Sequence, residues 1–502
     1  MLKKLLALML ALVMVLAMAA CGSEEYQFDD DDEDDDDDNV KSSSTVKVPS
    51  AIPDDNIVVI PGGGVVVVPD NNVTPGGGDD DDDDYDNLAS KFNTEGQFEN
   101  VLLYENDNIK VIAVGITYSN YVIELTFQLI NKMNTPVFIG THNGIAINGI
   151  MTSNYAGDYV DPKETVLSTA FISYDELLLL GIDSIAELEM EISYRKDNEY
   201  MSTVVKTAKI ETSIYSSYTY SDSAFRDSIT AENHPLGDML KVNDHKAGKL
   251  LSTCGMTVSS VTFIELEGCE WVLIEVDNAA GETLTLCLDD IALNGVCFNE
   301  SESISVHPGR KGVLMLECDY IAAKEVRAHY GIDKVARVSG NAEVYNNDYS
   351  YLEQYVPYSL MANDNSYVST VTGTEIFRQD GISILYQGTE YDNTNDYKCA
   401  YIYMAVSNND TNCPYVGISQ NREASDIMIN GKVAEDAYLR TVYVNQGEIG
   451  AFYIILEEET IELLGIKSAS DIRTVEFNIE VWEGDGDEMG KIAAPTLSFS
   501  AN

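Results

Sequence analysis

The sequence has little positive charge, few histidines and only two tryptophans. Its 502 residues include 30 lysines and arginines against 84 aspartates and glutamates, which gives a formal net charge of −54. A field of this sign repels phosphate groups. Nucleic acids and anionic lipid head groups are therefore not expected as partners.

The motifs that usually mark a catalytic or cofactor site are also absent. The sequence has no P-loop, no dinucleotide-binding glycine pattern, no HExxH and no G-x-S-x-G. In a chain this acidic, pairs of carboxylates arise by accident and indicate nothing, and the loop "EGDGDEMG" from Glu483 is more typical of turns than of calcium. Five histidines stand singly and are interpreted as surface residues: His142, His234, His245, His307 and His329. We expect no enzyme, no cofactor and no metal site; an active site assembled between modules is the remote alternative.

Cysteine is sparse and irregularly placed. Seven cysteines follow the N-terminal region, an odd number, and none lies between residues 91 and 219. A disulfide framework would use an even number and recur in each repeat, and no C-x-x-C spacing suggests zinc. We expect most of these residues to be buried as small apolar side chains, and one disulfide remains open.

The N-terminus carries the most specific motif. Lys3 and Lys4 precede an apolar run that ends in small residues, the pattern of a secretory signal. The stretch Met18-Ala19-Ala20-Cys21 resembles the lipobox of bacterial lipoproteins, with methionine where leucine is usual. The resemblance implies a signal peptide over 1–20, cleavage before Cys21 and a lipid on its sulfur. An ordinary signal peptide cut near Ala20 is the alternative.

The lipid would be the sole anchor, because no later segment is apolar enough to span a bilayer. We therefore predict a lipid-anchored protein on the outer, extracellular face of the bacterial cell membrane. Residues 21–90 are predicted to be the lipidated cysteine followed by a disordered acidic spacer, since the aspartate runs at 29–38 and 79–84 repel themselves and bury nothing. Loose binding of divalent cations by these aspartates is the alternative.

Beyond residue 90 one pattern occurs three times. Asn-Gly lies between apolar runs at 148–149, 294–295 and 430–431, and predicts a type I′ hairpin at each. A short helical phrase and a Gly-Ile pair follow, with the glycines at 181, 331 and 465. Upstream, Asn131, Asn278 and Asn408 each end a run with apolar residues at every second position. The repeats define three segments: module 1 (91–219), module 2 (236–362) and module 3 (372–502). The polar stretches at 216–235 and 363–369 are expected to bury little.

Each module has six to eight short alternating runs and one short helix, which favours an antiparallel two-sheet sandwich. The predicted fold class is all-β: three tandem immunoglobulin-like sandwiches after an acidic linker. The leader, spacer and repeats together resemble uncharacterised lipoproteins of anaerobic Gram-positive bacteria with tandem immunoglobulin-like modules. That resemblance implies no catalytic residues.

The matched strand suggests a binding face. Module 1 has Glu124, Thr126 and Gln128 between its apolar positions, whereas module 2 has Trp271 and module 3 has Tyr401 and Tyr403. Such aromatic side chains are covered by a neighbouring element or form a platform that stacks on a sugar or a protein. We expect non-catalytic binding or adhesion modules for a glycan, wall polymer or protein; a purely structural envelope spacer is the alternative.

Overall fold

The computed structural model describes residues 88–502 except 197–198, 200–201, 364–370, 394–397, 411–412, 414, 422–425, 485–489 and 502. Earlier in the chain it describes the backbone of β1 (Ile57–Val59) and β2 (Val65–Val67). The signal peptide and Cys21 lie outside the described residues. The chain divides into two compact units, 1–78 and 79–502.

The first unit contains β1 and β2, which pair antiparallel with Ile57 opposite Val67. Both strands lie in the segment expected to be a spacer. Runs of β-branched residues on either side of three glycines account for this pair.

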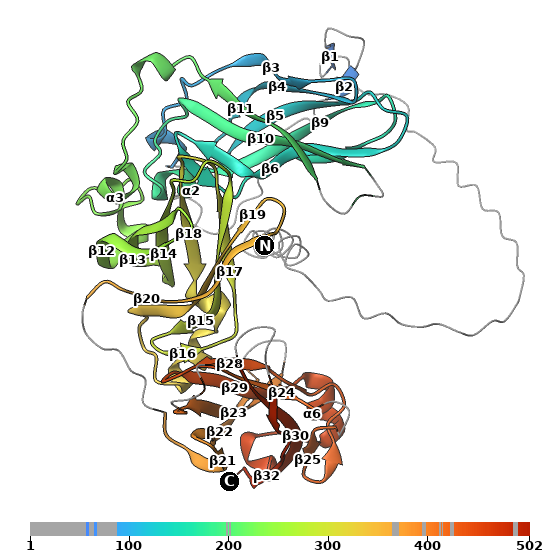
Figure 1. Ribbon diagram of the computed structural model, residues 1–502, viewed down its shortest axis with the longest axis vertical. Coiled ribbons are helices and arrows are strands. Elements are labelled where there is room, and N and C mark those ends of the chain that lie inside the picture. The colour runs from blue at the N-terminus through green and yellow to red at the C-terminus, as the bar shows by residue number, and fades with distance from the viewer. Residues whose placement is uncertain are drawn as a thin grey trace, which may run out of the picture. The chain divides into compact units, whose positions relative to one another are not determined.

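The second unit is mainly β, with several antiparallel sheets, which confirms the predicted class (Figure 1). Module 1 contains η3 (Ala89–Lys91), β3 (Glu99–Glu105), β4 (Ile109–Tyr118), β5 (Val122–Asn131), β6 (Val137–Ile147), β7 (Ile150–Thr152), β8 (Gly157–Val160), β9 (Thr165–Ser173), α2 (Tyr174–Leu179), β10 (Glu187–Lys196) and β11 (Thr203–Glu211). The segment that connects β11 to module 2 begins within the last residues of module 1 and contains η4 (Tyr215–Ser217) and α3 (Ala224–Ile229).

Module 2 begins at η5 (Gly237–Met239). It continues through β12 (Leu240–Thr253), β13 (Met256–Leu266), β14 (Cys269–Asn278), β15 (Leu284–Leu293), β16 (Val296–Cys297), β17 (Glu302–Val306), β18 (Lys311–Glu317), α4 (Cys318–Ile321), α5 (Lys324–His329), β19 (Arg337–Asn346) and β20 (Tyr351–Met361).

Module 3 contains β21 (Thr374–Gln379), β22 (Ile382–Asp392), β23 (Cys399–Asn408), β24 (Tyr415–Gln420), β25 (Met428–Ile429), β26 (Lys432–Val433), β27 (Tyr438–Leu439), β28 (Val442–Asn445), β29 (Ile449–Leu456), α6 (Glu458–Leu464), η6 (Ala469–Asp471), β30 (Thr474–Glu483), β31 (Gly490–Ala493) and β32 (Thr496–Ser500).

The three Asn-Gly turns are hairpins, as predicted. At Asn148-Gly149, φ is 51° and 86°, and the other two turns have the same signs. Each asparagine also bridges to the strand that follows the module's helix. The Asn294 side-chain oxygen accepts from the backbone N–H groups of Ala336 (2.9 Å) and Arg337 (3.0 Å), and its amide donates to Lys334 (2.7 Å). Asn148 and Asn430 make the same three bonds at their own positions.

Two of the sheets cross the expected module boundaries. Strand β7 pairs in parallel with β18, with Ile150 opposite Lys311, and β16 pairs in parallel with β29, with Val296 opposite Ile449. One sheet therefore has the order β11-β10-β6-β7-β18-β14-β13-β12, and a second has β20-β19-β15-β16-β29-β23-β22-β21. We call β7 and β16 exit strands, and β18 and β29 entry strands. The two smaller sheets have the orders β3-β4-β5-β9 and β26-β25-β30-β24-β28.

The hydrophobic clusters cross the boundaries as well. Leu273, Ile264 and Val313 of module 2 belong to the cluster of module 1, and Tyr403 and Tyr453 of module 3 belong to that of module 2. In β5, β14 and β23 the positions predicted to face inward are buried. Modules 2 and 3 also bury part of the outer face of this strand: Leu273 and Tyr403 are buried there, together with the charged Glu275 of β14.

Three expectations need correction. Module 2 has two short helices, because Ala322 is extended between them and its carbonyl accepts from the buried Arg327 Nε at 3.0 Å. The stretch 216–235 is not a bare linker, since Phe225 and Ile229 of α3 are 2% and 1% exposed. His307 is fully buried rather than on the surface.

Candidate binding pockets at the two junctions

The two pockets described here lie where an entry strand begins, one at each junction. The residue directly before the entry strand is Arg310 in module 2 and Glu448 in module 3. It meets side chains on the strand that the Asn-Gly asparagine bridges, β10 in module 1 and β19 in module 2. The two pockets therefore lie at corresponding positions of the repeat.

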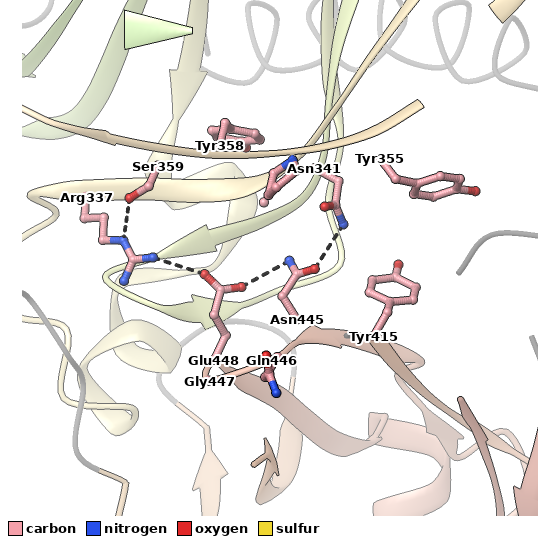
Figure 2. Close-up of a pocket in the computed structure, with 12 residues that line it drawn as sticks. Arg337, Asn341, Tyr355, Tyr358, Ser359, Tyr415, Asn445, Gln446, Gly447 and Glu448 are labelled. Carbon is pink, nitrogen blue, oxygen red and sulfur yellow. Dashed lines mark hydrogen bonds and ion pairs between the residues drawn. The ribbon is translucent and has the colours of Figure 1, made fainter. Parts of the chain in front are cut away.

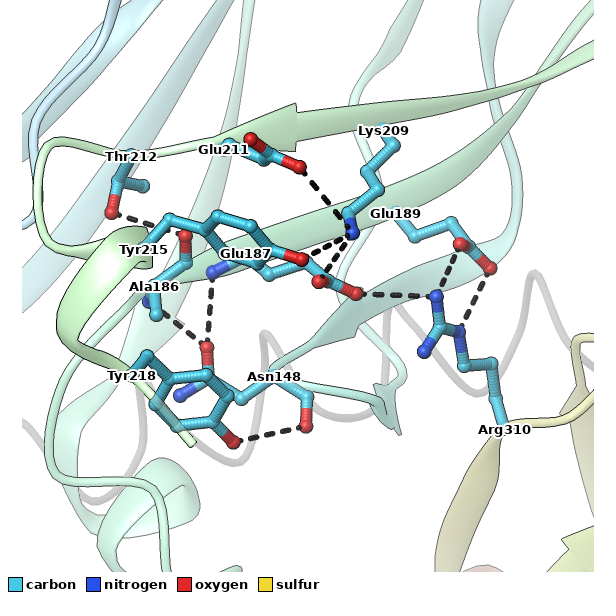
Figure 3. Close-up of polar contacts among 10 residues, drawn as sticks. All are labelled: Asn148, Ala186, Glu187, Glu189, Lys209, Glu211, Thr212, Tyr215, Tyr218 and Arg310. Atoms are coloured by element: carbon cyan, nitrogen blue, oxygen red, sulfur yellow. Dashed lines mark hydrogen bonds and ion pairs between the residues drawn. The ribbon is translucent and has the colours of Figure 1, made fainter. Parts of the chain in front are cut away.

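At the first junction Arg310 joins two acidic side chains of β10. Its Nη2 lies 3.1 Å from Glu187 and 2.6 Å from Glu189, and its Nε donates to Glu189 at 3.1 Å (Figure 3). Lys209 on β11 lies 2.7 Å from Glu187 on the other side. The hydrogen bonds to Glu189 raise the pKa of the already basic Arg310. This ion-pair network ties module 1 to module 2 through charge-assisted hydrogen bonds, of which the two from Arg310 to Glu189 form a bidentate pair.

Tyrosines from the connecting segment wall this first pocket. Tyr215, Tyr218 and Tyr220 line it together with Glu187 and Arg310, around a volume of about 270 Å³. Lys209 donates to the Tyr215 hydroxyl at 3.0 Å, and its ammonium lies 4.6 Å from the centre of that ring. The connecting segment thus supplies both cover for the ion pairs and aromatic surface.

The second pocket, at the junction of modules 2 and 3, is larger, with a volume of about 570 Å³. A chain of polar contacts forms one side of it (Figure 2). Arg337 donates to Ser359 at 3.0 Å and pairs with Glu448 at 3.4 Å. Asn445 donates to Glu448 at 3.3 Å and accepts from Asn341 at 3.2 Å. The charges that line the pocket are therefore paired with one another.

Tyrosines form the rest of this second pocket: Tyr355, Tyr358 and Tyr415. The Tyr415 hydroxyl donates to Asp290 at 2.5 Å, and its ring stacks on Tyr443 with centres 5.5 Å apart. Tyr358 is 5% exposed, and its hydroxyl has no hydrogen-bond partner among the described residues. A buried hydroxyl of this kind is costly unless a ligand or water satisfies it.

A group of buried carboxyls lies behind the Tyr415 wall. Burial raises the pKa of Asp290, an effect that the hydrogen bonds from Tyr415 and Asn341 oppose. Burial, followed by repulsion from Asp290, raises the pKa of Asp289 to about 6. Burial and both aspartates raise the pKa of Glu343 to about 7. Asp289 and Glu343 therefore titrate closer to neutrality than ordinary carboxyls, but none of the three groups lines the pocket.

Most polar side chains that line the second pocket are uncharged. Among its lining residues there is no histidine, cysteine or lysine, and its one glutamate is held by Arg337, Ser339 and Asn445. What the pocket offers is aromatic faces beside amide and hydroxyl groups. Elsewhere, the described residues contain no cluster of three or more His, Cys, Asp or Glu side chains placed to hold a metal ion.

The aromatic side chains predicted as a binding face lie elsewhere. Tyr403 is 1% exposed and stacks on His329 of module 2 with ring centres 3.9 Å apart. Tyr401 is half-buried and stacks on Tyr403 at 5.6 Å, and Trp271 is half-buried against the cluster of module 1. In this arrangement a neighbouring module covers much of each ring. Cys21, the predicted lipidation site, lies outside the described residues.

Sequence reasoning missed the junction pockets because their walls come from segments about a hundred residues apart. The available signal was tyrosine density, at 215–220 and at 345–358. The seven cysteines of the described part form no disulfide; five are buried, Cys269 is half-buried and Cys254 is exposed. Thus the expectation of mostly buried thiols is confirmed.

Comparisons with known proteins name no relative of established function. No family model matches the chain, and no curated protein matches it. Among solved structures, the chain is similar to a protein of unknown function from Porphyromonas gingivalis W83. The match has 10% identity, covers 52% of this chain and 97% of that one, and has a TM-score of 0.12. A TM-score this low supports no argument. In the described part of the chain no helix is long and apolar enough to cross a membrane.

Proposed function

We propose that the chain is a lipid-anchored, extracellular surface protein of three immunoglobulin-like sandwich modules that binds a glycan or wall-polymer segment without catalysis. The lipobox-like leader ending at Cys21 supports the anchor, and the threefold Asn-Gly bridge supports the module count. A protein ligand in the same pocket is the alternative occupant.

The observation that carries the binding proposal is the tyrosine-walled pocket between modules 2 and 3. Aromatic rings stack on the apolar faces of sugars, and the neighbouring amides and hydroxyls bond to sugar hydroxyls. The arginine and glutamate in the lining are already paired, which favours an uncharged ligand. The net charge of −54 further disfavours anionic ones.

The test is an array of neutral glycans and wall polymers probed with the full chain. Tyr355→Ala removes one pocket wall and should weaken binding by about tenfold, equivalent to about 1.4 kcal/mol. Tyr351→Ala, on the same strand but 55% exposed and outside the lining, is the matched control and should bind as the parent does. Absence of any ligand on the array, or equal binding by both variants, would refute the proposal.

A structural spacer is the second candidate, and the sheets that cross both junctions favour it. Modules joined by shared strands hold a fixed separation better than modules on flexible linkers. Spin labels in modules 1 and 3 should then give one narrow distance distribution. A broad distribution would count against the spacer.

A further inference from the structure

In module 3 the strand that corresponds to the exit strands is β26, which pairs with β25 on one side and with no described strand on the other. Strands β7 and β16 are buried along their length, whereas both residues of β26 are exposed, with Val433 at 42%. At the two junctions the carbonyl of the turn glycine accepts a hydrogen bond from the first backbone N–H group of the entry strand. Gly149 accepts from Lys311 at 3.1 Å, and Gly295 accepts from Ile449 at 3.0 Å. Gly431 has the corresponding position in module 3, and β26 ends its sheet. An open edge of this kind is a template for strand addition.

The short helix of module 3 also has a side chain that no neighbouring element covers in the described part of the chain. Two residues before the Gly-Ile glycine lie Leu179 in module 1, His329 in module 2 and Leu463 in module 3. Leu179 is 4% exposed, and His329 stacks on Tyr403 of the next module at 3.9 Å. Leu463 is 62% exposed. The side chain at this position is covered in module 1 and stacked in module 2, whereas in module 3 it is a leucine exposed to solvent.

The charges at the junctions indicate what would fit there. Acidic β10 meets Arg310 of module 2, and Arg337 of β19 meets Glu448 of module 3. On β30 the uncharged Thr474 occupies the position of Glu187 and Arg337, and the exposed Glu476 occupies the position of Glu189 in β10 and of Ser339, which donates to Glu448, in β19. The carboxylate of Glu476 would therefore pair best with a basic residue directly before the strand that a partner adds.

A second copy of this chain does not supply that residue. In module 1 the strand that corresponds to the entry strands is β9, which pairs with β5 and ends the described sheet β3-β4-β5-β9. The residue directly before β9 is the exposed Glu164, which would face Glu476. The outer face of β5, the strand beside β9, carries Glu124 and Thr126, whereas module 2 has Trp271 and Leu273 at these positions. Like charges and a polar face both oppose contact with Leu463.

We propose that the open end of module 3, formed by β26, Leu463 and Glu476, docks a β-sandwich module of another protein. The partner would present an edge strand that pairs in parallel with β26, an arginine or lysine directly before that strand, and an apolar outer face beside it. The contact is heterologous, so it extends the array by one module rather than closing a symmetric dimer.

The test converts module 1 into the stated partner. The variant is the full chain with Glu124→Trp, Thr126→Leu and Glu164→Arg. These substitutions copy Trp271, Leu273 and Arg310 of module 2 at the corresponding positions. We expect sedimentation velocity to show concentration-dependent oligomers, with a monomeric parent chain. Adding Leu463→Glu and Glu476→Arg in module 3 should restore the monomer, which separates docking from nonspecific aggregation.

Several outcomes would overturn the proposal. A folded triple variant that stays monomeric shows that the end of module 3 does not dock such a module. Oligomers that persist after the module 3 changes show that the new apolar face merely aggregates. A parent that oligomerises through Leu463 would identify a second copy as the occupant. If the triple variant does not fold, Glu164→Arg alone changes only an exposed side chain; it should give weaker association that Glu476→Arg abolishes, and its remaining monomeric would count against docking.

Discussion

Glu343 shows how a single side chain makes the stability of this protein depend on pH. Its pKa is raised to about 7 by burial and by Asp289 and Asp290. A carboxyl whose pKa is higher in the folded state favours folding below its unfolded pKa, near 4.5, and loses that contribution as pH rises through 7.

Glu343→Gln should therefore stabilise the protein at pH 8 by about 3 kcal/mol, and the gain should vanish near pH 4.5, because the pKa rises from 4.5 to about 7 and one pKa unit corresponds to about 1.4 kcal/mol. Urea unfolding at both pH values measures this. Glu353→Gln, an exposed site on β20, is the control and should show no such difference. A gain that is equal at both pH values would show that Glu343 is not the titrating group.

Cys21 is the residue on which the proposed location depends. Cys21→Ser removes the sulfur to which the lipid would be attached, so the protein should move from the membrane fraction to the medium. Fractionation, together with incorporation of a labelled fatty acid by the parent chain, measures the change. Retention of the variant in the membrane and an unlabelled parent would contradict the lipoprotein proposal.

Among the elements, the Asn-Gly hairpin combines a local turn with a tertiary contact. Asn294→Ala removes two acceptor bonds and one donor bond and places alanine at a φ of 50°. We expect a loss of about 2–3 kcal/mol in the free energy of unfolding.

Asn430→Ala provides the matched comparison for that loss. Asn430 makes the same three bonds but is exposed, and β26, which follows it, pairs with β25 but with no entry strand among the described residues. Its substitution should cost less. Thermal and urea unfolding measure both losses. If Asn294→Ala and Asn430→Ala lose the same free energy of unfolding, the asparagine stabilises only the turn and not the junction.

The repeated elements could be predicted because their signals are local. Asn-Gly requires positive φ at both residues, and a period of two places Leu125, Phe127 and Leu129 on one buried face. The partner of an exit strand could not be predicted, since Ile150 and Lys311 are far apart in sequence and no pattern specifies a parallel pair. Helix α3 was missed because two buried side chains, Phe225 and Ile229, lie within a polar stretch. The pockets could not be predicted either, because segments far apart in the sequence form their walls.

Across the whole molecule, the shared sheets predict cooperative unfolding. Because β7 and β16 each complete a sheet of the next module, no module can unfold without exposing the edge of a neighbour. Calorimetry should show one main transition for residues 88–502, and limited proteolysis should leave the connection at 216–235 uncut, since α3 is packed into a core. Three separate transitions, or early cleavage at α3, would contradict this coupling.

The reversal of charge between the two junctions has a consequence for how such a chain can change in length. Tandem arrays commonly gain and lose units by recombination, which works when every unit fits every other. Here a chain without module 2 would set Glu187 and Glu189 against Glu448, and a duplicated module 2 would set Arg310 against Arg337. Like charges would meet at either new boundary, so the ion pairs disfavour the loss or duplication of module 2 and fix the order of the three modules.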